Sequence, residues 1–212
     1  MEEFWESKFR DIKTMWGMEP ADSAVQAKDF FLQHQIRDIM IPGVGYGRNA
    51  GVFLDNGITV TGIEISETAI RLAKEAGRPD FQIHHGSVTQ MPFDNKRYDG
   101  IFCYALVHLL NKPERKRLIR CCYDQLNPGG YMIFTVVSKK SELYGRGRLL
   151  SNDRYEISKG LKVYFYDTDS ATKEFKSFGL VELQEIDEPV KHIENEPPMK
   201  CIRVKCKRNQ TA

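Results

Sequence analysis

Three glycines, Gly43, Gly45 and Gly47, follow an apolar segment with the character of a buried strand and precede the start of a helix. Glycine allows positive φ and lets the backbone approach a ligand without a Cβ in the way. Glu64 lies 21 residues after Gly43, at the end of the next predicted strand, where a carboxylate can accept hydrogen bonds from ribose hydroxyls. Together these residues indicate a site for a nucleoside-containing cofactor.

The spacing of the glycines narrows the class of cofactor. The pattern is G-x-G-x-G, whereas the dinucleotide fingerprint G-x-G-x-x-G would place its third glycine at position 48, which is Arg48. This difference argues against a nicotinamide-dependent oxidoreductase. A tight turn between a strand and a helix, followed by an exposed Glu64, is the structural alternative to a binding site.

The elements around this turn alternate between strand and helix. Helices are predicted over 23–34, from Ser66 to Gly77, after Asn111 and over 169–178, and strands over 38–41, 58–65, 81–85, 98–104, 131–138, 180–186 and 199–207. The alternation predicts an α/β fold, a Rossmann-like three-layer sandwich with a seven-stranded, mostly parallel sheet and an antiparallel edge strand. Ligands bind at the carboxyl ends of such strands, so the loops after Ile41, Ile65, His85 and Tyr104 should face the site.

Composition and charge limit the class of protein. The 212 residues are 41% hydrophobic and 28% charged, and no linker divides the chain, so residues 1–212 are expected to form a single domain. Thirty-one basic and 29 acidic residues are too balanced to provide the basic surface of a nucleic-acid-binding protein. No apolar run approaches the roughly 18 residues that a membrane span needs, and the N-terminus has no signal-peptide core, which predicts a cytoplasmic location. The five cysteines have neither framework nor metal-ligand spacing, so we expect reduced thiols and no metal site.

From about residue 36 to 134 the motifs occur in the order found in the class I S-adenosylmethionine-dependent methyltransferases, which the sequence resembles. The later landmarks of that family are matched by MPFD (91–94), YDGIF (98–102) and LNPGGYMIF (126–134). The resemblance implies S-adenosylmethionine as the cofactor and S-adenosylhomocysteine as the product. Residues 16–20, WGMEP, and 47–50, GRNA, further resemble the tellurite-resistance and thiopurine methyltransferase branch of small-molecule enzymes.

The same resemblance implies roles for individual residues. The glycine loop would pass beside the methionine part of the cofactor, Glu64 would bind the ribose, and residues 86–88 would line the adenine. The implied cofactor-binding residues are Trp16, Gly43, Val44, Gly45, Gly47, Asn49, Glu64, Ile65, Ser87, Val88 and Cys103. For Trp16, a role as an anchoring aromatic of the core is the alternative. Ile41 and Ser87 depart from the family pattern, because many members carry acids there. A non-catalytic module that binds S-adenosylmethionine for sensing or scaffolding is the alternative to an enzyme.

Methyl transfer from a sulfonium needs little side-chain chemistry, because the methyl group is already activated and the acceptor has only to be held in line with it. His108 is the nearest candidate for a general base, with packing of a short helix as the alternative. Tyr104 could line the acceptor pocket or simply close its strand. The D/N-P-P-Y/F stretch of nucleic-acid methylation is absent after 98–104, so the expected acceptor is a small molecule.

Three further segments carry expectations. Residues 1–35 are expected to form a helical segment that covers the site. The irregular, polar and aromatic stretch 139–166 is expected to be a substrate lid, since loops on a rigid sheet commonly carry binding groups, with an ordinary solvated loop as the alternative. The basic run KPERKR (112–117) is interpreted as a solvated helix face.

Overall fold

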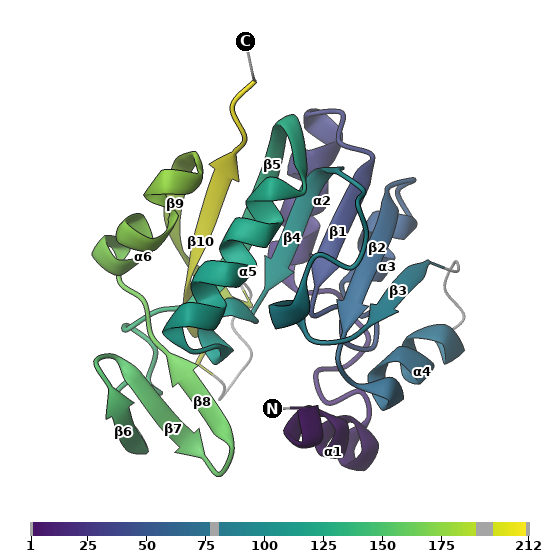
Figure 1. Cartoon of the computed structure of the whole chain (residues 1–212). Helices are drawn as coiled ribbons and strands as arrows, with labels where there is room; N and C mark the ends of the chain where they lie inside the picture. Colours follow the sequence, from purple (N-terminus) through teal and green to yellow (C-terminus); the bar gives the residue numbers. More distant parts are fainter. Residues whose placement is uncertain (1, 77–80, 190–196, 211–212) are drawn as a thin grey trace.

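The computed structural model describes residues 2–76, 81–189 and 197–210 (Figure 1). Its helices are α1 (Glu2–Ile12), α2 (Asp22–Gln33), α3 (Ala50–Leu54), α4 (Glu67–Glu75), α5 (Lys112–Asp124) and α6 (Thr168–Phe175), with the 3-10 turns η1 (Val88–Gln90), η2 (Val107–Leu109) and η3 (Lys176–Phe178). Its strands are β1 (Asp38–Pro42), β2 (Thr59–Glu64), β3 (Gln82–His85), β4 (Tyr98–Tyr104), β5 (Leu126–Val137), β6 (Arg148–Ser151), β7 (Arg154–Ser158), β8 (Leu161–Tyr164), β9 (Leu180–Glu188) and β10 (Met199–Lys207). No helix within these described ranges is long and apolar enough to cross a membrane.

Seven strands form one sheet in the order β3-β2-β1-β4-β5-β10-β9 (Figure 1). The first five strands of this order pair in parallel, whereas β10 is antiparallel to both β5 and β9. The predicted seven-stranded, mostly parallel sheet is confirmed, and its reversed strand lies between β5 and the edge strand β9. The order reverses between β1 and β4, so the carboxyl ends of these strands form the switch point at which ligands bind in such sheets.

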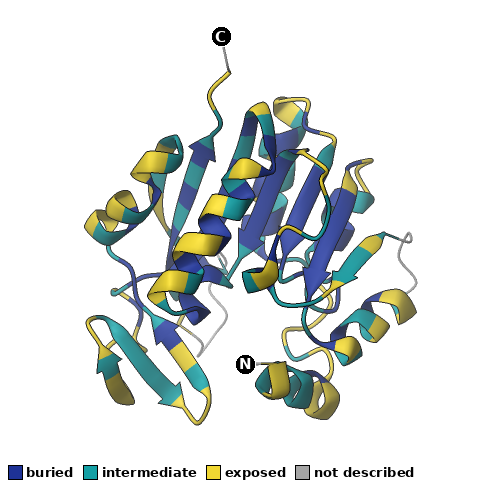
Figure 2. Cartoon of the chain, in the orientation of Figure 1, coloured by how far each residue is buried: buried dark blue, intermediate teal, exposed yellow. Residues whose placement is uncertain are grey.

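Helices cover both faces of the sheet. Phe31 of α2 and Phe53 of α3 belong to the apolar cluster on one face, and Leu118 of α5 and Phe175 of α6 belong to the cluster on the other. Figure 1 shows α5 in front of the sheet and α2 behind it, and Figure 2 shows that the central strands are buried while exposed residues lie on the outer sides of the helices. Burial of this apolar surface is the main force that holds the three layers together.

Local sequence signals start two of the helices. Ser66 caps α4, its hydroxyl accepting the N–H of Ala69 at 3.1 Å, and the predicted end of this helix at Gly77 lies outside the described residues. Asn111 and Glu114 form a reciprocal cap at the start of α5. The backbone N–H of Asn111 donates to the Glu114 carboxylate at 2.8 Å, and the backbone N–H of Glu114 donates to Asn111 Oδ1 at 3.1 Å. These caps satisfy N–H groups that the helix leaves free.

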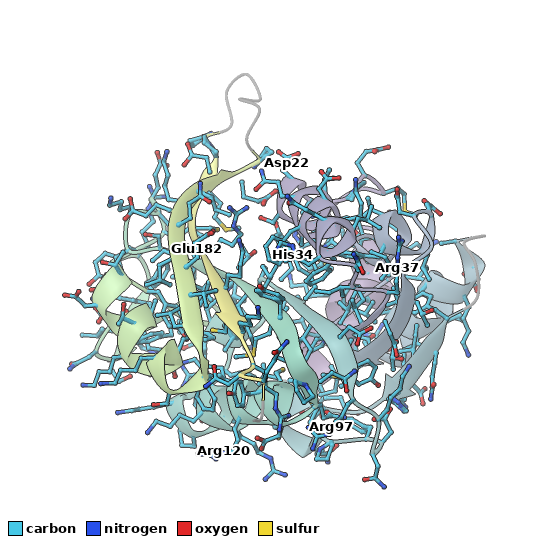
Figure 3. The ribbon with its side chains drawn as sticks, turned by 90° about the horizontal axis from the view of Figure 1, so that it is seen from above. Asp22, His34, Arg37, Arg97, Arg120 and Glu182 are labelled. Atoms are coloured by element: carbon cyan, nitrogen blue, oxygen red, sulfur yellow. The ribbon has the colours of Figure 1, made fainter. Side chains whose placement is uncertain are left out.

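Helix α2 is capped instead by a residue from the far end of the chain. Glu188, at the end of β9, accepts the N–H groups of Asp22 at 2.9 Å and Ser23 at 3.1 Å, and also the Ser23 hydroxyl. Figure 3 labels Asp22 at this junction. The buried carboxylate of Glu188 thus fastens α2 to the edge strand of the sheet.

Residues 139–166 contain regular structure, so the expectation of an irregular stretch is wrong. Strands β6, β7 and β8 form a three-stranded antiparallel meander. Its two-residue turns are Asn152-Asp153 and Lys159-Gly160, with φ of 59° at Asp153 and 86° at Gly160. Two-residue turns of this chemistry are a hairpin signal, which the polar composition of the short strands obscured.

One residue of the basic run in α5 is buried, so the interpretation of 112–117 as a solvated face is wrong at Arg115. This side chain lies on the side of α5 that faces α6, and the residue is 4% exposed. Its Nε lies 3.2 Å from each carboxylate oxygen of Glu174, and its guanidinium lies 3.8 Å from the ring centre of Tyr164.

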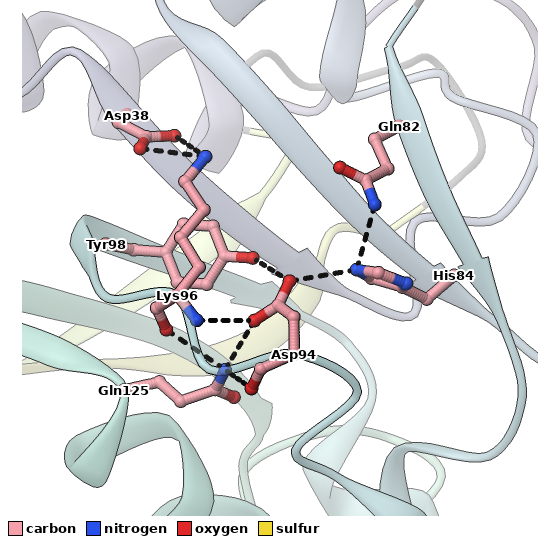
Figure 4. Close-up of polar contacts among 7 residues, drawn as sticks. All are labelled: Asp38, Gln82, His84, Asp94, Lys96, Tyr98 and Gln125. Atoms are coloured by element: carbon pink, nitrogen blue, oxygen red, sulfur yellow. Dashed lines mark hydrogen bonds and ion pairs between the residues drawn. The ribbon is translucent and has the colours of Figure 1, made fainter.

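A polar network closes the amino end of the sheet, opposite the glycine turn (Figure 4). Asp94 lies within 3.0 Å of His84 Nε2 and accepts the hydroxyl of Tyr98 at 2.9 Å and the side-chain N–H of Gln125 at 3.1 Å. Burial alone would raise the pKa of Asp94, but the hydrogen bonds from Tyr98 and His84 hold it below its ordinary value. The network joins β3, β4 and the end of α5, and Gln125 Oε1 is the one of its atoms that is buried without a partner among the described residues.

Candidate functional site

The glycine turn after β1 and the carboxylate that ends β2 are in direct contact. Gly43, Gly45 and Gly47 have φ of 69°, 59° and 79°, a region that L side chains rarely adopt. The N–H of Gly45 donates to Glu64 Oε2 at 2.8 Å, and the N–H of Gly43 donates to the Ile63 carbonyl at 2.8 Å. The turn therefore presents its backbone at the joined carboxyl ends of β1 and β2.

Close packing holds this turn in place. Val44 is buried against β2, where a Cβ at Gly62 would lie 2.7 Å from Val44 Cγ1. A Cβ at Gly47 would lie 3.4 Å from Ala73 Cβ of α4. Gly43 is covered by Leu106, whose Cδ2 would lie 2.9 Å from a Cβ at that position. At Gly45 and Gly47 an added Cβ would make ordinary contacts, so the positive φ is what requires glycine in the turn, whereas Gly62 of β2 is required by close packing against Val44.

Glu64 is 5% exposed, so the alternative of an exposed carboxylate after a simple turn does not describe this structure. Its oxygens accept the N–H groups of Gly45 and Ile65 at 2.8 Å and of Ser66 at 3.0 Å. Burial raises the pKa of Glu64, and these N–H groups oppose the shift. Because a carboxylate offers about four lone-pair positions, the three bonds leave room for a further donor such as a hydroxyl.

The segment before α2 is tied to the glycine turn. Trp16 is 52% exposed and stacks on Tyr46, with ring centres 6.3 Å apart and planes at 12°. The Tyr46 hydroxyl accepts a hydrogen bond from the backbone N–H of Trp16 at 3.2 Å, and the Arg48 guanidinium donates to the backbone carbonyl of Trp16 at 2.7 Å. Asn49, expected to bind cofactor, uses its side-chain oxygen to accept the N–H of Ala21 at 2.9 Å. Asn49 therefore anchors the start of α2.

Helix α1 lies beyond the carboxyl ends of the strands, beside α4 (Figure 1). Glu6 accepts hydrogen bonds from the Ser66 hydroxyl at 2.6 Å and the Thr68 N–H at 3.2 Å. Phe9 reaches Gly45, where its Cζ would lie 3.8 Å from a Cβ. The same helix contacts the meander, since Phe4 would lie 2.9 Å from a Cβ at Gly160.

The residues expected near the adenine follow β3. The N–H of Gly86 donates to the Glu64 carbonyl at 2.8 Å. Ser87, the next residue after Gly86, therefore lies close to the backbone of Glu64, the candidate ribose-binding residue. Ser87 caps η1, with its hydroxyl 2.8 Å from that of Thr89. Val88 is buried beneath this turn. The backbone carbonyl oxygen of Ile65 lies 3.2 Å from His85 Nε2.

The end of β4 places its two expected residues differently. Cys103 is fully buried within the core, and burial raises the pKa of its thiol. Tyr104 is half-buried on the opposite face of the sheet, with the Arg48 guanidinium 6.0 Å from its ring centre. Burial raises the pKa of Tyr104, and Arg48 opposes this rise while Glu188 adds to it. Tyr104 is therefore protonated at neutral pH.

His108, in η2, lies at the carboxyl end of β5. It is 6% exposed, and its Nδ1 accepts the N–H of Val137 at 3.3 Å. Burial lowers the pKa of His108 to about 4. The imidazole is therefore neutral at pH 7.

The structure brings the glycine turn, Glu64, Ile65 and residues 86–88 together through direct hydrogen bonds. Trp16 and Asn49 join them through the N-terminal segment, whereas Cys103 lies in the core. Glu6, Phe9 and Tyr46 were missed by the sequence analysis. Tyr46 could have been noticed as the aromatic residue inside the glycine loop, but no spacing relates Glu6 to its partners in α4.

The comparisons with known proteins agree with this architecture. The sequence pattern of the family described as "Methyltransferase domain" matches residues 41–134, from β1 to β5. Ubiquinone biosynthesis O-methyltransferase of Paracidovorax citrulli is 25% identical over 115 residues, covering 52% of this chain and 48% of that protein. The enzyme of the same name from Coxiella burnetii is 25% identical over 150 residues, covering 65% of this chain and 63% of the Coxiella protein. The chain thus matches about half to two thirds of the length of these relatives.

Solved methyltransferase structures share the fold over almost the whole chain. A 1,6-didemethyltoxoflavin-N1-methyltransferase from Burkholderia thailandensis, with bound 1,6-didemethyltoxoflavin and S-adenosylhomocysteine, superposes with a TM-score of 0.73 at 15% identity, covering 99% of this chain and 87% of that chain. The CcbJ methyltransferase from Streptomyces caelestis superposes with a TM-score of 0.70 at 17% identity, covering 100% of both chains.

Proposed function

We propose that this chain is a class I S-adenosylmethionine-dependent methyltransferase that transfers a methyl group from S-adenosylmethionine to a small-molecule acceptor; the match to the methyltransferase-domain pattern and the shared fold support this. The observation that carries the proposal is the contact between the glycine turn and the buried carboxylate of Glu64. This carboxylate retains a lone-pair position for a ribose hydroxyl. The positive φ of the turn allows close approach of the cofactor to the backbone.

Different residues of the site would bind different parts of the cofactor. Glu64 would accept ribose hydroxyls, Ser87 and Val88 would border the adenine, and the turn from Gly43 to Gly47 would face the methionine part. When bound, S-adenosylmethionine supplies an electrophilic methyl group on a positively charged sulfur. The protein's remaining task is to exclude water and align the acceptor. Residues 1–35 and the meander are the elements that we propose cover the site.

The names of the similar proteins support a small-molecule acceptor. One is a ubiquinone biosynthesis O-methyltransferase, and another was solved with the small molecule 1,6-didemethyltoxoflavin. These proteins are 25% and 15% identical to this chain. A screen of candidate small molecules with the purified protein would identify the acceptor. Detection of S-adenosylhomocysteine as the common product makes the screen independent of the acceptor chosen.

Calorimetric titration with S-adenosylmethionine and S-adenosylhomocysteine tests the proposal. Glu64→Gln is expected to weaken binding roughly 10- to 100-fold, because a hydrogen bond to a charged group contributes about 1.5–3 kcal/mol. Glu67→Gln is the matched control, since this neighbouring side chain is 83% exposed, and NADH is the ligand control. Absence of binding to the wild-type protein would overturn the proposal. Tight binding without turnover in the acceptor screen would instead support a non-catalytic module.

A further inference from the structure

His108 is the buried histidine of the described part of the chain, and its Nδ1 is already in use. The N–H of Val137 donates to Nδ1 at 3.3 Å. A ring nitrogen that accepts an N–H carries no proton, so the proton of the neutral imidazole is on Nε2. This arrangement makes Nε2–H a hydrogen-bond donor.

The Nε2–H group has no hydrogen-bond partner among the described residues. The enclosed side-chain atoms that lack a partner there are Gln125 Oε1, Thr135 Oγ1, Arg154 Nε and Arg203 Nε. His108 Nε2 is not one of them, so it keeps some accessible surface although the residue is only 6% exposed. A donor that keeps accessible surface and has no protein partner can donate to a ligand atom that approaches from that side. The free donor therefore points to a ligand atom.

The surroundings of η2 indicate which ligand would suit this donor. η2 packs against β5 and β8, and Leu109, Val137, Val163 and Phe165 form an apolar cluster there. The rings of Trp5, from α1, and Tyr155, from the meander, pack against that cluster. Apolar and aromatic walls with a single oriented polar group are typical of sites for small ring compounds.

We propose that His108 donates the Nε2–H hydrogen bond to the methyl acceptor, and that the acceptor is a ring compound with an oxygen or nitrogen able to accept it. This inference rests on the proposed function and replaces the expected general base, because neither ring nitrogen is free to take a proton. In the transfer, the acceptor's lone pair forms the new bond to carbon, and the sulfur–carbon bond pair stays with sulfur. Any proton on the acceptor atom leaves to solvent water.

Nuclear magnetic resonance of the ¹⁵N-labelled full chain with S-adenosylhomocysteine tests the inference. The ring ¹⁵N shifts are expected to place the proton of His108 on Nε2 throughout the range from about pH 5 to 8, in which an ordinary histidine titrates. Pyridine is expected to move the Hε2 resonance downfield, whereas isosteric benzene, which cannot accept the bond, leaves it unchanged. His84, whose Nε2 lies 3.0 Å from Asp94, is the internal control.

Two variants separate the donor from the packing of the ring. His108→Gln retains a side-chain N–H and is expected to keep the preference for pyridine over benzene, measured at the amide of Leu109, whereas His108→Leu should abolish it. A proton found on Nδ1, or equal responses to pyridine and benzene, would overturn the inference. Failure of the proposed function would be seen separately, as absent calorimetric binding of S-adenosylhomocysteine.

Discussion

The carboxylate of Glu6 accepts the hydroxyl of Ser66 at 2.6 Å, although 60 positions separate the two residues in the sequence. Ser66 is also the N-cap of α4 and donates its N–H to Glu64. A single short stretch at the end of β2 therefore fixes both the candidate ribose-binding carboxylate and the N-terminal helix above it.

Removal of the Glu6 carboxylate should release α1. Glu6→Ala loses the bonds to Ser66 and Thr68, so we expect trypsin to cleave several-fold faster after Lys8, Arg10 and Lys13. Glu3→Ala, in the exposed first turn of the same helix, is the control. Equal cleavage of the two variants would show that aromatic packing alone holds α1.

The Arg115–Glu174 pair should be costly to break from one side. Arg115→Met is expected to lower the free energy of unfolding by about 3–5 kcal/mol, because the Glu174 carboxylate, largely buried, loses its cationic partner and keeps only the hydrogen bond from the Tyr166 hydroxyl. The double variant Arg115→Met/Glu174→Leu should recover most of that loss, and exposed Lys116→Met should change little. Urea unfolding measures all three, and a double variant as unstable as the single one would contradict this account.

Two glycines with similar φ should respond differently to a methyl group. Gly57 has φ of 71° with nothing within 4 Å of an added Cβ, whereas Gly179 has φ of 68° with the Lys207 carbonyl oxygen at 2.0 Å. Gly57→Ala should cost about 1–2 kcal/mol from backbone strain alone. Gly179→Ala should cost clearly more, because a backbone carbonyl in β10 cannot move aside. Thermal unfolding of the two variants gives the comparison, and equal losses would refute it.

The protonation of Glu64 should leave a signature in the pH dependence of stability. Burial raises the pKa of Glu64 in the folded state above its ordinary value of 4.5. The folded protein therefore binds this proton more tightly than the unfolded chain, and the contribution to stability declines as pH rises through the raised pKa. The free energy of unfolding of the wild type relative to Glu64→Gln should fall over that interval in cofactor-free protein. A rising difference would mean that the N–H groups of Gly45, Ile65 and Ser66 outweigh burial.

The sequence by itself determined the features that depend on neighbouring residues. The caps at Ser66 and Asn111 act over three positions, and the glycine turn is a local backbone requirement. Alternation of buried strands with amphipathic helices was sufficient to predict the seven-stranded sheet. A strand buried on both faces is a short apolar run, whereas a helix that covers the sheet has apolar residues at helical spacing, so the two can be told apart in the sequence. The candidate pairing of the turn with Glu64 was also accessible, since adjacent parallel strands bring their carboxyl ends together.

Only the tertiary structure decided the contacts between distant segments. Asn49 anchors Ala21, Glu188 caps α2 across 165 positions, and Arg115 is buried against Glu174, because packing brings these groups together without any sequence spacing that would reveal it. The same holds for His108, whose residue type suggested a base. Which of its nitrogens carries the proton depends on the Val137 N–H, and that contact exists only once η2 has packed against the end of β5.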